Sequence, residues 1–161
     1  MINNLDKLAG LLGQRLGRRR LAVAESCTGG LLGSAITGSP GSSGYFVGGV
    51  ICYADEVKTG LLGVPQSLLE KWGAVSPQVA EAMASGARKL LEADIAVAVS
   101  GIAGPGGGSL EKPVGLVYIS VASGAKTITR KFNFPGSRSQ VKEQSAIEAL
   151  NVLLEILNYG I

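Results

Sequence analysis

The chain has 161 residues, of which 46% are apolar and 17% charged, so it can fold as one domain with a substantial core. Its 15 Lys and Arg against 12 Asp and Glu leave a net charge of only +3, which is weak support for nucleic-acid binding. There is no histidine, and the two cysteines, Cys27 and Cys52, form neither a disulfide framework nor a set of metal ligands. We expect one domain over residues 1–161, with no metal and no cofactor.

The sequence predicts neither membrane nor nucleic-acid partners. No apolar run approaches the roughly 18 residues that a membrane span needs, and the N-terminus has no signal-peptide pattern, so we expect a cytoplasmic protein. The one basic cluster, residues 18–20, lies at the end of a predicted helix, where cations complement the helix dipole. We favour that interpretation over nucleic-acid binding, because no aromatic residues are interleaved with the arginines.

The first part of the chain alternates between helical and extended patterns. Leucines at helical spacing predict an amphipathic helix over residues 3–18, and an apolar run predicts a buried strand over 21–25. A helix over 31–37 follows a glycine turn. A second strand is predicted over 45–53, with its two central glycines indicating a bulge or a close backbone approach. A short helix over 55–62 comes next.

The second part of the chain predicts a helix, a strand, a hairpin and a last helix, over residues 77–92, 95–100, 114–122 with 126–134, and 137–158. Ser76 and Pro77 are typical of a helix start, and Ser137 with Gln140 fits a capping box. The hairpin is expected to turn across Ser123-Gly124. This pattern predicts a single α/β domain with a mixed sheet.

A first candidate site lies where the strand over 21–25 meets the glycine turn. Ser26 there is a candidate nucleophile, and because histidine is absent its base would have to be another residue, with lysine the first candidate. Ser26 also fits a helix N-cap, which its spacing alone favours. Cys27 is an alternative nucleophile, since a helix N-terminus lowers the pKa of a thiol. Four backbone N–H groups of the turn would stabilise an oxyanion, those of Cys27, Thr28, Gly29 and Gly30.

A second candidate is formed by Tyr53, at the end of a predicted strand, and Lys58, in the helix that follows. Both side chains could turn toward the sheet edge that carries Ser26. A lysine amine is a poor base at its ordinary pKa of about 10.4, and burial or nearby positive charge can lower that value. The tyrosine hydroxyl could relay the proton or orient the nucleophile. Taken alone, Lys58 is better interpreted as a solvated helix residue and Tyr53 as an amphipathic strand end.

A third candidate joins the glycine-rich loop over 101–108 to Arg138. Glycines let backbone amides approach an anion, and an arginine in the first turn of a helix would add a bidentate contact to a phosphate. The loop has neither the G-x-x-x-x-G-K-[ST] pattern of an ATPase nor a G-x-G-x-x-G leading into a helix. Taken alone, Arg138 would be a surface arginine.

Together these segments resemble the CinA C-terminal domain family, and the similarity covers nearly the whole chain. The motifs that carry it are LAVAESCTGG at 21–30, GGVICYADEVK at 48–58, AVSPQVAEAMA at 74–84, SGIAGPGGG at 100–108, KPVGLVYI at 112–119 and FPGSR at 134–138. Several separated motifs in the right order make this a specific signal. The resemblance implies a three-layer α/β/α sandwich with a mixed sheet.

Stand-alone members of that family are nicotinamide-nucleotide amidases. The resemblance therefore implies hydrolysis of the carboxamide of nicotinamide mononucleotide, with release of ammonia for pyridine-nucleotide salvage. It implies a site in which Ser26 is the nucleophile, Lys58 the general base and Tyr53 its helper, without a metal. The phosphate and ribose would be held by Arg138 and the glycine loop, through Gly101, Gly104, Gly106 and Gly107.

The sequence departs from the family pattern at two points, and it also allows a second class of function. We expect no counterpart of the N-terminal domain that larger members carry. Where much of the family has a second arginine one turn after Arg138, this sequence has Lys142, a point charge rather than a fork. A non-catalytic nucleotide-binding or regulatory module, linked to competence or DNA damage, would keep Arg138 without needing Ser26 or Lys58. The leucine-rich first and last helices also allow a homo-oligomer, of which a dimer is the simplest.

Overall fold

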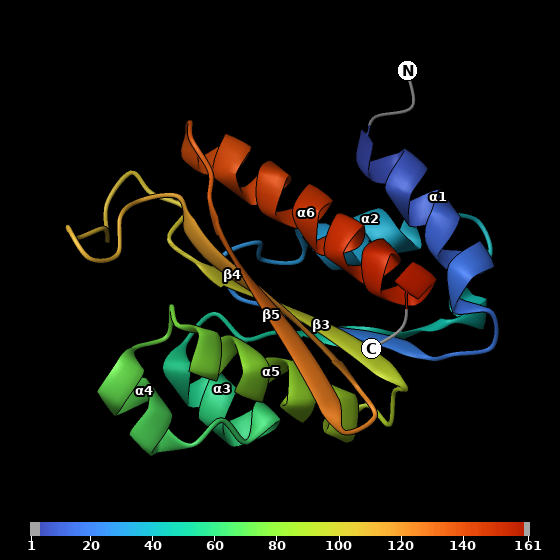
Figure 1. The fold of residues 1–161 in the computed structure, drawn as a ribbon, viewed down its shortest axis with the longest axis horizontal. Coiled ribbons are helices and arrows are strands. Elements are labelled where there is room, and N and C mark those ends of the chain that lie inside the picture. Colours follow the sequence, from blue (N-terminus) through green and yellow to red (C-terminus); the bar gives the residue numbers. More distant parts are fainter. Residues whose placement is uncertain (1–3, 160–161) are drawn as a thin grey trace.

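The structure is a computed structural model that describes residues 4–159, and in it a five-stranded sheet lies between two layers of helices (Figure 1). The strand order is β2-β1-β3-β4-β5. β1 runs parallel to β2 and to β3, whereas β4 runs antiparallel to β3 and to β5, so the sheet is mixed as predicted. The strands are β1 Leu21–Glu25, β2 Phe46–Ile51, β3 Ile95–Gly101, β4 Leu116–Ser123 and β5 Lys126–Asn133.

The helices divide between the two faces of the sheet, which makes the three-layer sandwich (Figure 1). One face is covered by α1 Asn4–Leu16, α2 Leu31–Thr37 and α6 Arg138–Tyr159. The other face is covered by α3 Asp55–Leu62, α4 Gln66–Trp72 and α5 Pro77–Leu90. A short 3-10 turn, Ser42–Gly44, precedes β2. Within residues 4–159, no helix combines the length and the apolar character needed to cross a membrane.

The central strand shows why two helical layers form. Successive side chains of β3 point to opposite faces, and its branched residues Ile95, Val97 and Val99 join the core under α1 and α6. The alternate residues Ala96 and Ala98 join the core under α5. Because alanine is short, α5 packs close to the sheet, and both faces are removed from water.

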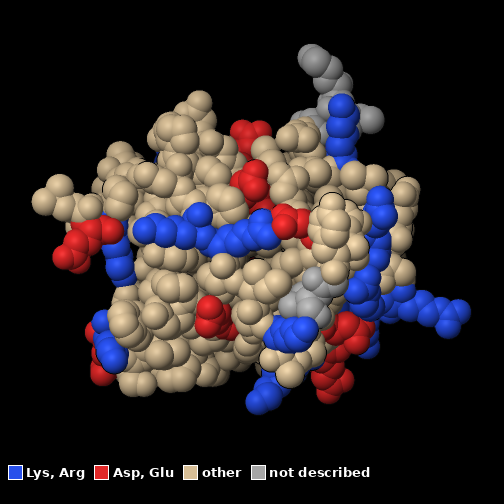
Figure 2. Space-filling view, in the orientation of Figure 1, with Lys and Arg blue, Asp and Glu red and all other residues tan. Residues whose placement is uncertain are grey.

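The basic cluster at residues 18–20 follows α1. The Arg19 guanidinium donates to the carbonyl oxygens of Leu16 and Arg15, at 3.2 and 2.8 Å, so it satisfies acceptors that the helix end leaves free. On the face drawn in Figure 2, Lys and Arg side chains are spread among acidic and uncharged ones, and several lie next to an acidic side chain. The helix-end role of the cluster agrees with its interpretation from the sequence.

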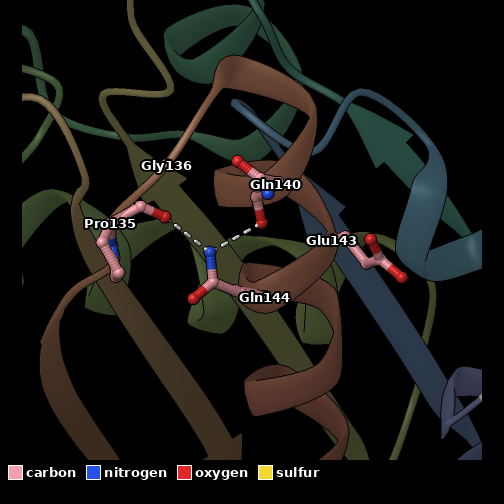
Figure 3. A pocket seen from close by; sticks show the side chains of 5 residues that line it. All are labelled: Pro135, Gly136, Gln140, Glu143 and Gln144. Atoms are coloured by element: carbon pink, nitrogen blue, oxygen red, sulfur yellow. Dashed lines mark hydrogen bonds between the residues drawn. The ribbon is translucent and has the colours of Figure 1, made fainter.

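Both predicted helix starts are confirmed. Ser76 Oγ accepts the amide of Val79 at 3.3 Å. At α6 the Ser137 amide donates to Gln140 Oε1 at 2.8 Å, and the Gln140 amide donates to Ser137 Oγ at 3.4 Å, which is a reciprocal capping box. Gln144 adds donations to the Pro135 and Gln140 carbonyls (Figure 3). The pocket drawn in Figure 3 therefore lies among the residues that cap the start of α6.

Several boundaries differ from the predictions for local reasons. α4 was not predicted; it is seven residues long and no side chain caps its start, so the chain offers little signal for it. The hairpin turns across Gly124-Ala125 rather than Ser123-Gly124, because Ser123 pairs with Lys126 and Gly124 takes the positive φ of 59° that the turn requires. The predicted close approach at the glycines of β2 is confirmed. The register shifts there, and a side chain at Gly49 would collide with Val23 of β1.

The parallel strands place the candidate residues. The carboxyl ends of β1, β2 and β3 lie at one edge of the sheet. The connection after β1 runs through α2 on one face, and the connection after β2 runs through α3, α4 and α5 on the other (Figure 1). The chain therefore changes direction at β1, and in open α/β sheets such a switch point is where ligands bind.

Candidate active site

A cavity of about 200 Å³ opens at this edge and collects residues from distant parts of the chain. Of the residues predicted from sequence, it brings together Ser26, Cys27, Tyr53, Lys58, Gly101 and Arg138. The full lining is Ser26, Cys27, Tyr53, Asp55, Lys58, Ala74, Val75, Gly101, Ala103 and Arg138.

Ser26 follows β1 directly, and its backbone holds it at the sheet edge. Its amide donates to the Val99 carbonyl of β3 at 3.0 Å, which extends the pairing of the two strands by one residue. The side chain does not cap α2, because the N-cap is Gly30, in a left-handed conformation with φ 99°. Ser26 Oγ makes no hydrogen bond within residues 4–159, so the N-cap interpretation is wrong and the hydroxyl is free to react at the cavity.

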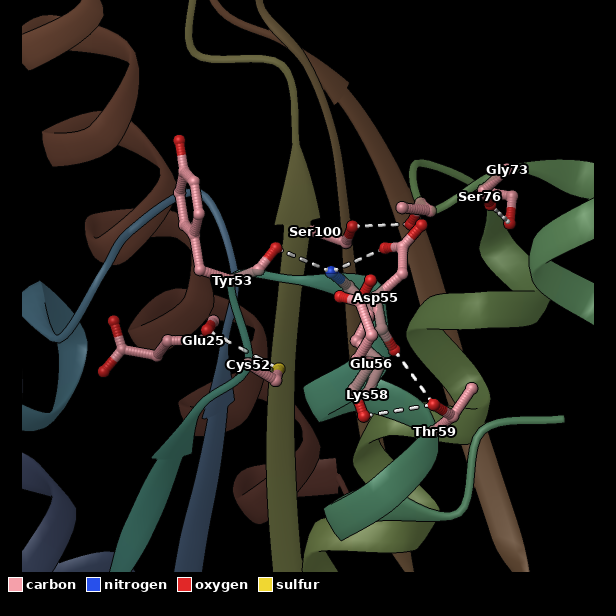
Figure 4. Close-up of polar contacts among 11 residues, drawn as sticks. Glu25, Cys52, Tyr53, Asp55, Glu56, Lys58, Thr59, Gly73, Ser76 and Ser100 are labelled. Carbon is pink, nitrogen blue, oxygen red and sulfur yellow. Dashed lines mark hydrogen bonds and ion pairs between the residues drawn. The ribbon is translucent and has the colours of Figure 1, made fainter. Parts of the chain in front are cut away.

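Lys58 is buried at the same cavity, with 1% of its surface exposed. Its Nζ donates to the Tyr53 carbonyl at 3.1 Å and to Asp55 Oδ1 at 3.2 Å (Figure 4). The interpretation of Lys58 as a solvated helix residue is therefore wrong. Asp55 was not predicted as a site residue, although its spacing of three from Lys58 on one helix is a signal that could have found it.

Tyr53 is placed differently from its predicted role. Its ring is 61% exposed and points away from Lys58, and its carbonyl rather than its hydroxyl binds the lysine (Figure 4). The hydroxyl accepts a hydrogen bond from Arg138 Nη2 at 3.0 Å. A proton relay through this hydroxyl to Lys58 has no contact to support it in the structure, so the ring of Tyr53 belongs to the rim of the cavity.

Arg138, the first residue of α6, links Tyr53 to the glycine-rich loop. Its Nη1 donates to the Gly104 carbonyl at 2.8 Å, so Gly104 contributes its oxygen rather than an amide. Gly101 ends β3 and lines the cavity, where a side chain would collide with Val117. The predicted binding residues Gly106 and Gly107 lie in the exposed part of the loop and do not line the cavity.

A second cation lies one turn after Arg138. Lys142 Nζ is 3.6 Å from the point where a Cβ on Gly29 would stand, so its ammonium lies against the turn that follows Ser26. Arg138 and Lys142 both lower the pKa of the Cys27 thiol slightly through their charge, which indicates that they face this turn together. The start of α6 thus gives the cavity a positive border.

Glu25 organises the turn that follows Ser26, a role that the sequence analysis missed. Its buried carboxylate accepts the amides of Gly30 and Leu32, each at 3.0 Å, and of Gly33 at 2.7 Å. These donors belong to the start of α2, so a side chain from the preceding strand satisfies the helix end. The sequence signal that could have indicated this role is the position of Glu25, directly before Ser26 and the glycine turn.

The hydrogen bonds of this turn reduce the number of backbone amides that could form the predicted oxyanion site. The Gly30 amide is taken by Glu25 and the Gly29 amide donates to the Ser26 carbonyl at 3.2 Å, so neither is available. Within residues 4–159 the amides of Cys27 and Thr28 donate no hydrogen bond to another residue. They are the two donors left to stabilise an oxyanion beside Ser26.

Glu25 is expected to contribute strongly to stability. We expect Glu25→Ala to lower the free energy of unfolding by about 3 kcal/mol or more, because each buried amide left unpaired costs about 1–3 kcal/mol. Urea denaturation measures this loss. Glu25→Gln keeps one acceptor oxygen and should lose less. A loss from Glu25→Ala as small as that of an ordinary surface substitution, about 0.5 kcal/mol, would show that the carboxylate does not hold the helix start.

The thiol of Cys27 is a poor competitor for the nucleophile's role. Burial raises the pKa of Cys27 to about 12, against an ordinary value of 9.0, and the nearby Glu25 acts in the same direction. The thiol is therefore protonated at neutral pH, while the reactive form is the thiolate. Folding raises the pKa of this thiol from 9.0 to about 12. The Cys27 thiol therefore makes its full contribution to the free energy of unfolding below pH 9, and the contribution is lost as the pH rises toward 12.

The fold and the cavity define an α/β protein with a serine hydroxyl and a buried lysine amine at the carboxyl ends of its parallel strands. The model of the CinA C-terminal domain family matches residues 5–157, and the chain belongs to that family. A CinA-like protein of Desulfotalea psychrophila is 51% identical over 154 residues, covering 94% of this chain and 37% of that protein. A putative competence-damage inducible protein of Halothermothrix orenii is 50% identical over 152 residues, with 92% and 37% covered. The chain thus spans little more than a third of these relatives.

Solved structures share the whole fold. The competence damage-inducible protein A of Klebsiella pneumoniae superposes with a TM-score of 0.95 at 35% identity, covering 99% of this chain and 100% of that one. The competence/damage inducible protein of Agrobacterium tumefaciens superposes with a TM-score of 0.93 at 37% identity, covering 97% and 96%. The predicted family and fold class are both confirmed.

Proposed function

We propose that the cavity is the active site of an amidase that hydrolyses the carboxamide of nicotinamide mononucleotide. One observation carries the proposal: a serine hydroxyl that makes no hydrogen bond within residues 4–159 and a buried lysine side chain line the same small cavity. A serine needs an adjacent base to act as a nucleophile, and the sequence contains no histidine to provide one. Lys58 is the base that the cavity offers.

The proposed reaction proceeds in two halves. Lys58, with its amine neutral, takes the proton of Ser26, and the serine oxygen bonds to the carboxamide carbon. The Cys27 and Thr28 amides donate to the oxyanion that forms. Lys58 then gives its proton to the departing nitrogen, the carbon–nitrogen bond breaks, and ammonia leaves an acyl-serine. Water, deprotonated by Lys58, attacks the acyl carbon, and the proton returns to Ser26 with release of the carboxylate.

The size and charge of the site support a nucleotide carrying a ring amide. At about 200 Å³ the cavity is smaller than a typical drug-sized site, so it suits the carboxamide ring rather than the whole nucleotide. Arg138, which lines the cavity, and Lys142, one turn further along α6, then form a positive border that suits a phosphate. No cofactor takes part in this reaction.

Arg138 provides a test of the phosphate assignment. We expect Arg138→Ala to raise KM for nicotinamide mononucleotide about 10-fold or more, because a charged hydrogen bond to a phosphate contributes about 1.5–3 kcal/mol. The matched control is nicotinamide riboside, which lacks the phosphate and should show little change in KM between the two proteins. Equal effects on both substrates would mean that Arg138 shapes the cavity through Tyr53 and Gly104 without binding phosphate.

The function itself is tested by identifying the products. Purified protein incubated with nicotinamide mononucleotide should release ammonia and nicotinate mononucleotide in equal amounts. Tight binding of the nucleotide without ammonia release would favour the other candidate class, a nucleotide-binding regulatory module. This second class is worth testing because the name of the Halothermothrix orenii relative refers to competence and damage rather than to an enzyme activity.

A further inference from the structure

The side chain of Asp55 contacts the amine on which the proposed reaction depends. Asp55 is the first residue of α3, is 55% exposed, and accepts a hydrogen bond from Lys58 Nζ at 3.2 Å. It also lines the cavity that holds Ser26. The carboxylate therefore reaches the lysine from the solvent side while the remainder of Lys58 stays buried.

The other titratable groups around Lys58 supply no second anion. Cys52, which precedes Tyr53, is neutral at neutral pH, since burial raises the pKa of its thiol to about 11. The Tyr53 hydroxyl is bonded to Arg138, itself a cation. Cys27 on the cavity wall is protonated as described, and Glu25 points away from Lys58 with its carboxylate bound to the amides of α2 (Figure 4). Within residues 4–159, Asp55 is the anion that binds the amine.

We propose that Asp55 is a positioning residue for Lys58 and that it sets the pH range in which the site is active. The inference rests on the proposed role of Lys58 as the base. A carboxylate at this distance favours the ammonium form of the lysine. It therefore stabilises Lys58 after the amine has taken the proton of Ser26, and it holds the amine in place as the third group of a nucleophile–base–orienting set.

The chain offers a matched control for this inference. Glu56 is the next residue of the same helix, is exposed, and has no side-chain contact with Lys58. Asp55→Asn and Glu56→Gln each remove one negative charge from the same helical turn, but only the first removes the contact at 3.2 Å. Asp55→Ser serves as a second variant if the asparagine protein folds poorly.

Two pH profiles test the inference. The first is kcat for ammonia release from nicotinamide mononucleotide. The second is the rate at which a fluorophosphonate labels Ser26, a reaction that forms the oxygen–phosphorus bond, expels fluoride and leaves the proton with the base. We expect the acid limb of both profiles to move to lower pH in Asp55→Asn, because the anion that contacts the Lys58 ammonium is lost. Glu56→Gln should stay near wild type, because a solvent-exposed charge without a contact is screened.

Each outcome separates this inference from the proposed function. A limb that stays in place or moves to higher pH in Asp55→Asn, or that moves equally in Glu56→Gln, overturns the role of Asp55. If the wild-type protein releases no ammonia but the labelling limb moves only in Asp55→Asn, the proposed substrate is wrong and the pairing of Asp55 with Lys58 stands. If ammonia is released but the acid limb of the labelling profile does not move in Asp55→Asn, the proposed substrate stands and the role of Asp55 is wrong.

Discussion

Replacing Ser26 with alanine is expected to lower kcat for amide hydrolysis by a factor on the order of 10⁴ or more, the scale of losing a catalytic nucleophile. The fold should survive, because the hydroxyl makes no hydrogen bond within residues 4–159 and the strand-end amide bond to Val99 is kept. The measurements are the rate of ammonia release, together with the binding affinity for the nucleotide, which should change little. Activity near the wild-type rate in Ser26→Ala would remove the serine from the reaction.

The matched control for Ser26 is its neighbour. Cys27→Ala should keep activity within a few-fold of wild type, because the thiol is buried, 5% exposed, and protonated at neutral pH, while its backbone amide is unchanged. Comparing Ser26→Ala with Cys27→Ala therefore distinguishes two candidate nucleophiles that are adjacent in the chain. A dead Cys27→Ala beside an active Ser26→Ala would transfer the nucleophile's role to the thiol.

The second large effect concerns the base. We expect Lys58→Met to lower kcat about 10²–10⁴-fold, the usual contribution of general acid–base catalysis, without unfolding the protein. Methionine is long, apolar and unbranched, so it can fill the buried path of the lysine stem. Replacing a buried ion-pair partner by a well-packed apolar side chain is often neutral for stability, although here Asp55 becomes unpaired at a half-exposed position.

Thermal unfolding is the control for Lys58→Met. A protein with a wild-type Tm and a low kcat supports the amine as the base, and one that keeps its kcat excludes it. If the protein unfolds at much lower temperature, Lys58→Gln, which keeps a polar group near the Tyr53 carbonyl, repeats the test. A wild-type kcat in that variant would also exclude the amine.

The elements around the site were predictable because their signals are local. The apolar run of β1, the spacing in α3 and the caps of α5 and α6 each lie within a few residues of the structure that they specify. The meeting of Ser26 with Lys58 was also within reach, because parallel strands end at one edge of a sheet. A short uncapped helix such as α4 has no comparable signal.

The details that were wrong or missed depend on side-chain direction. Whether Tyr53 turns its hydroxyl or its carbonyl toward Lys58 is decided by the packing of α6, whose Arg138 binds the hydroxyl from 85 residues away in the chain. The occupation of the α2 amides by Glu25 likewise depends on how the turn folds back on its strand. Residue types and spacing identify the participants of the site, and tertiary packing assigns the partners of each polar atom.

The most direct measurement locates the acyl group during turnover. Wild-type protein and Cys27→Ala are mixed with nicotinamide mononucleotide, quenched in acid, and digested for peptide mass analysis, while ammonia is followed in parallel. The mechanism predicts an acyl ester on the peptide that contains Ser26 in both proteins, with ammonia released by both. An acyl group that disappears in Cys27→Ala, or ammonia released at the wild-type rate by Ser26→Ala, would contradict it.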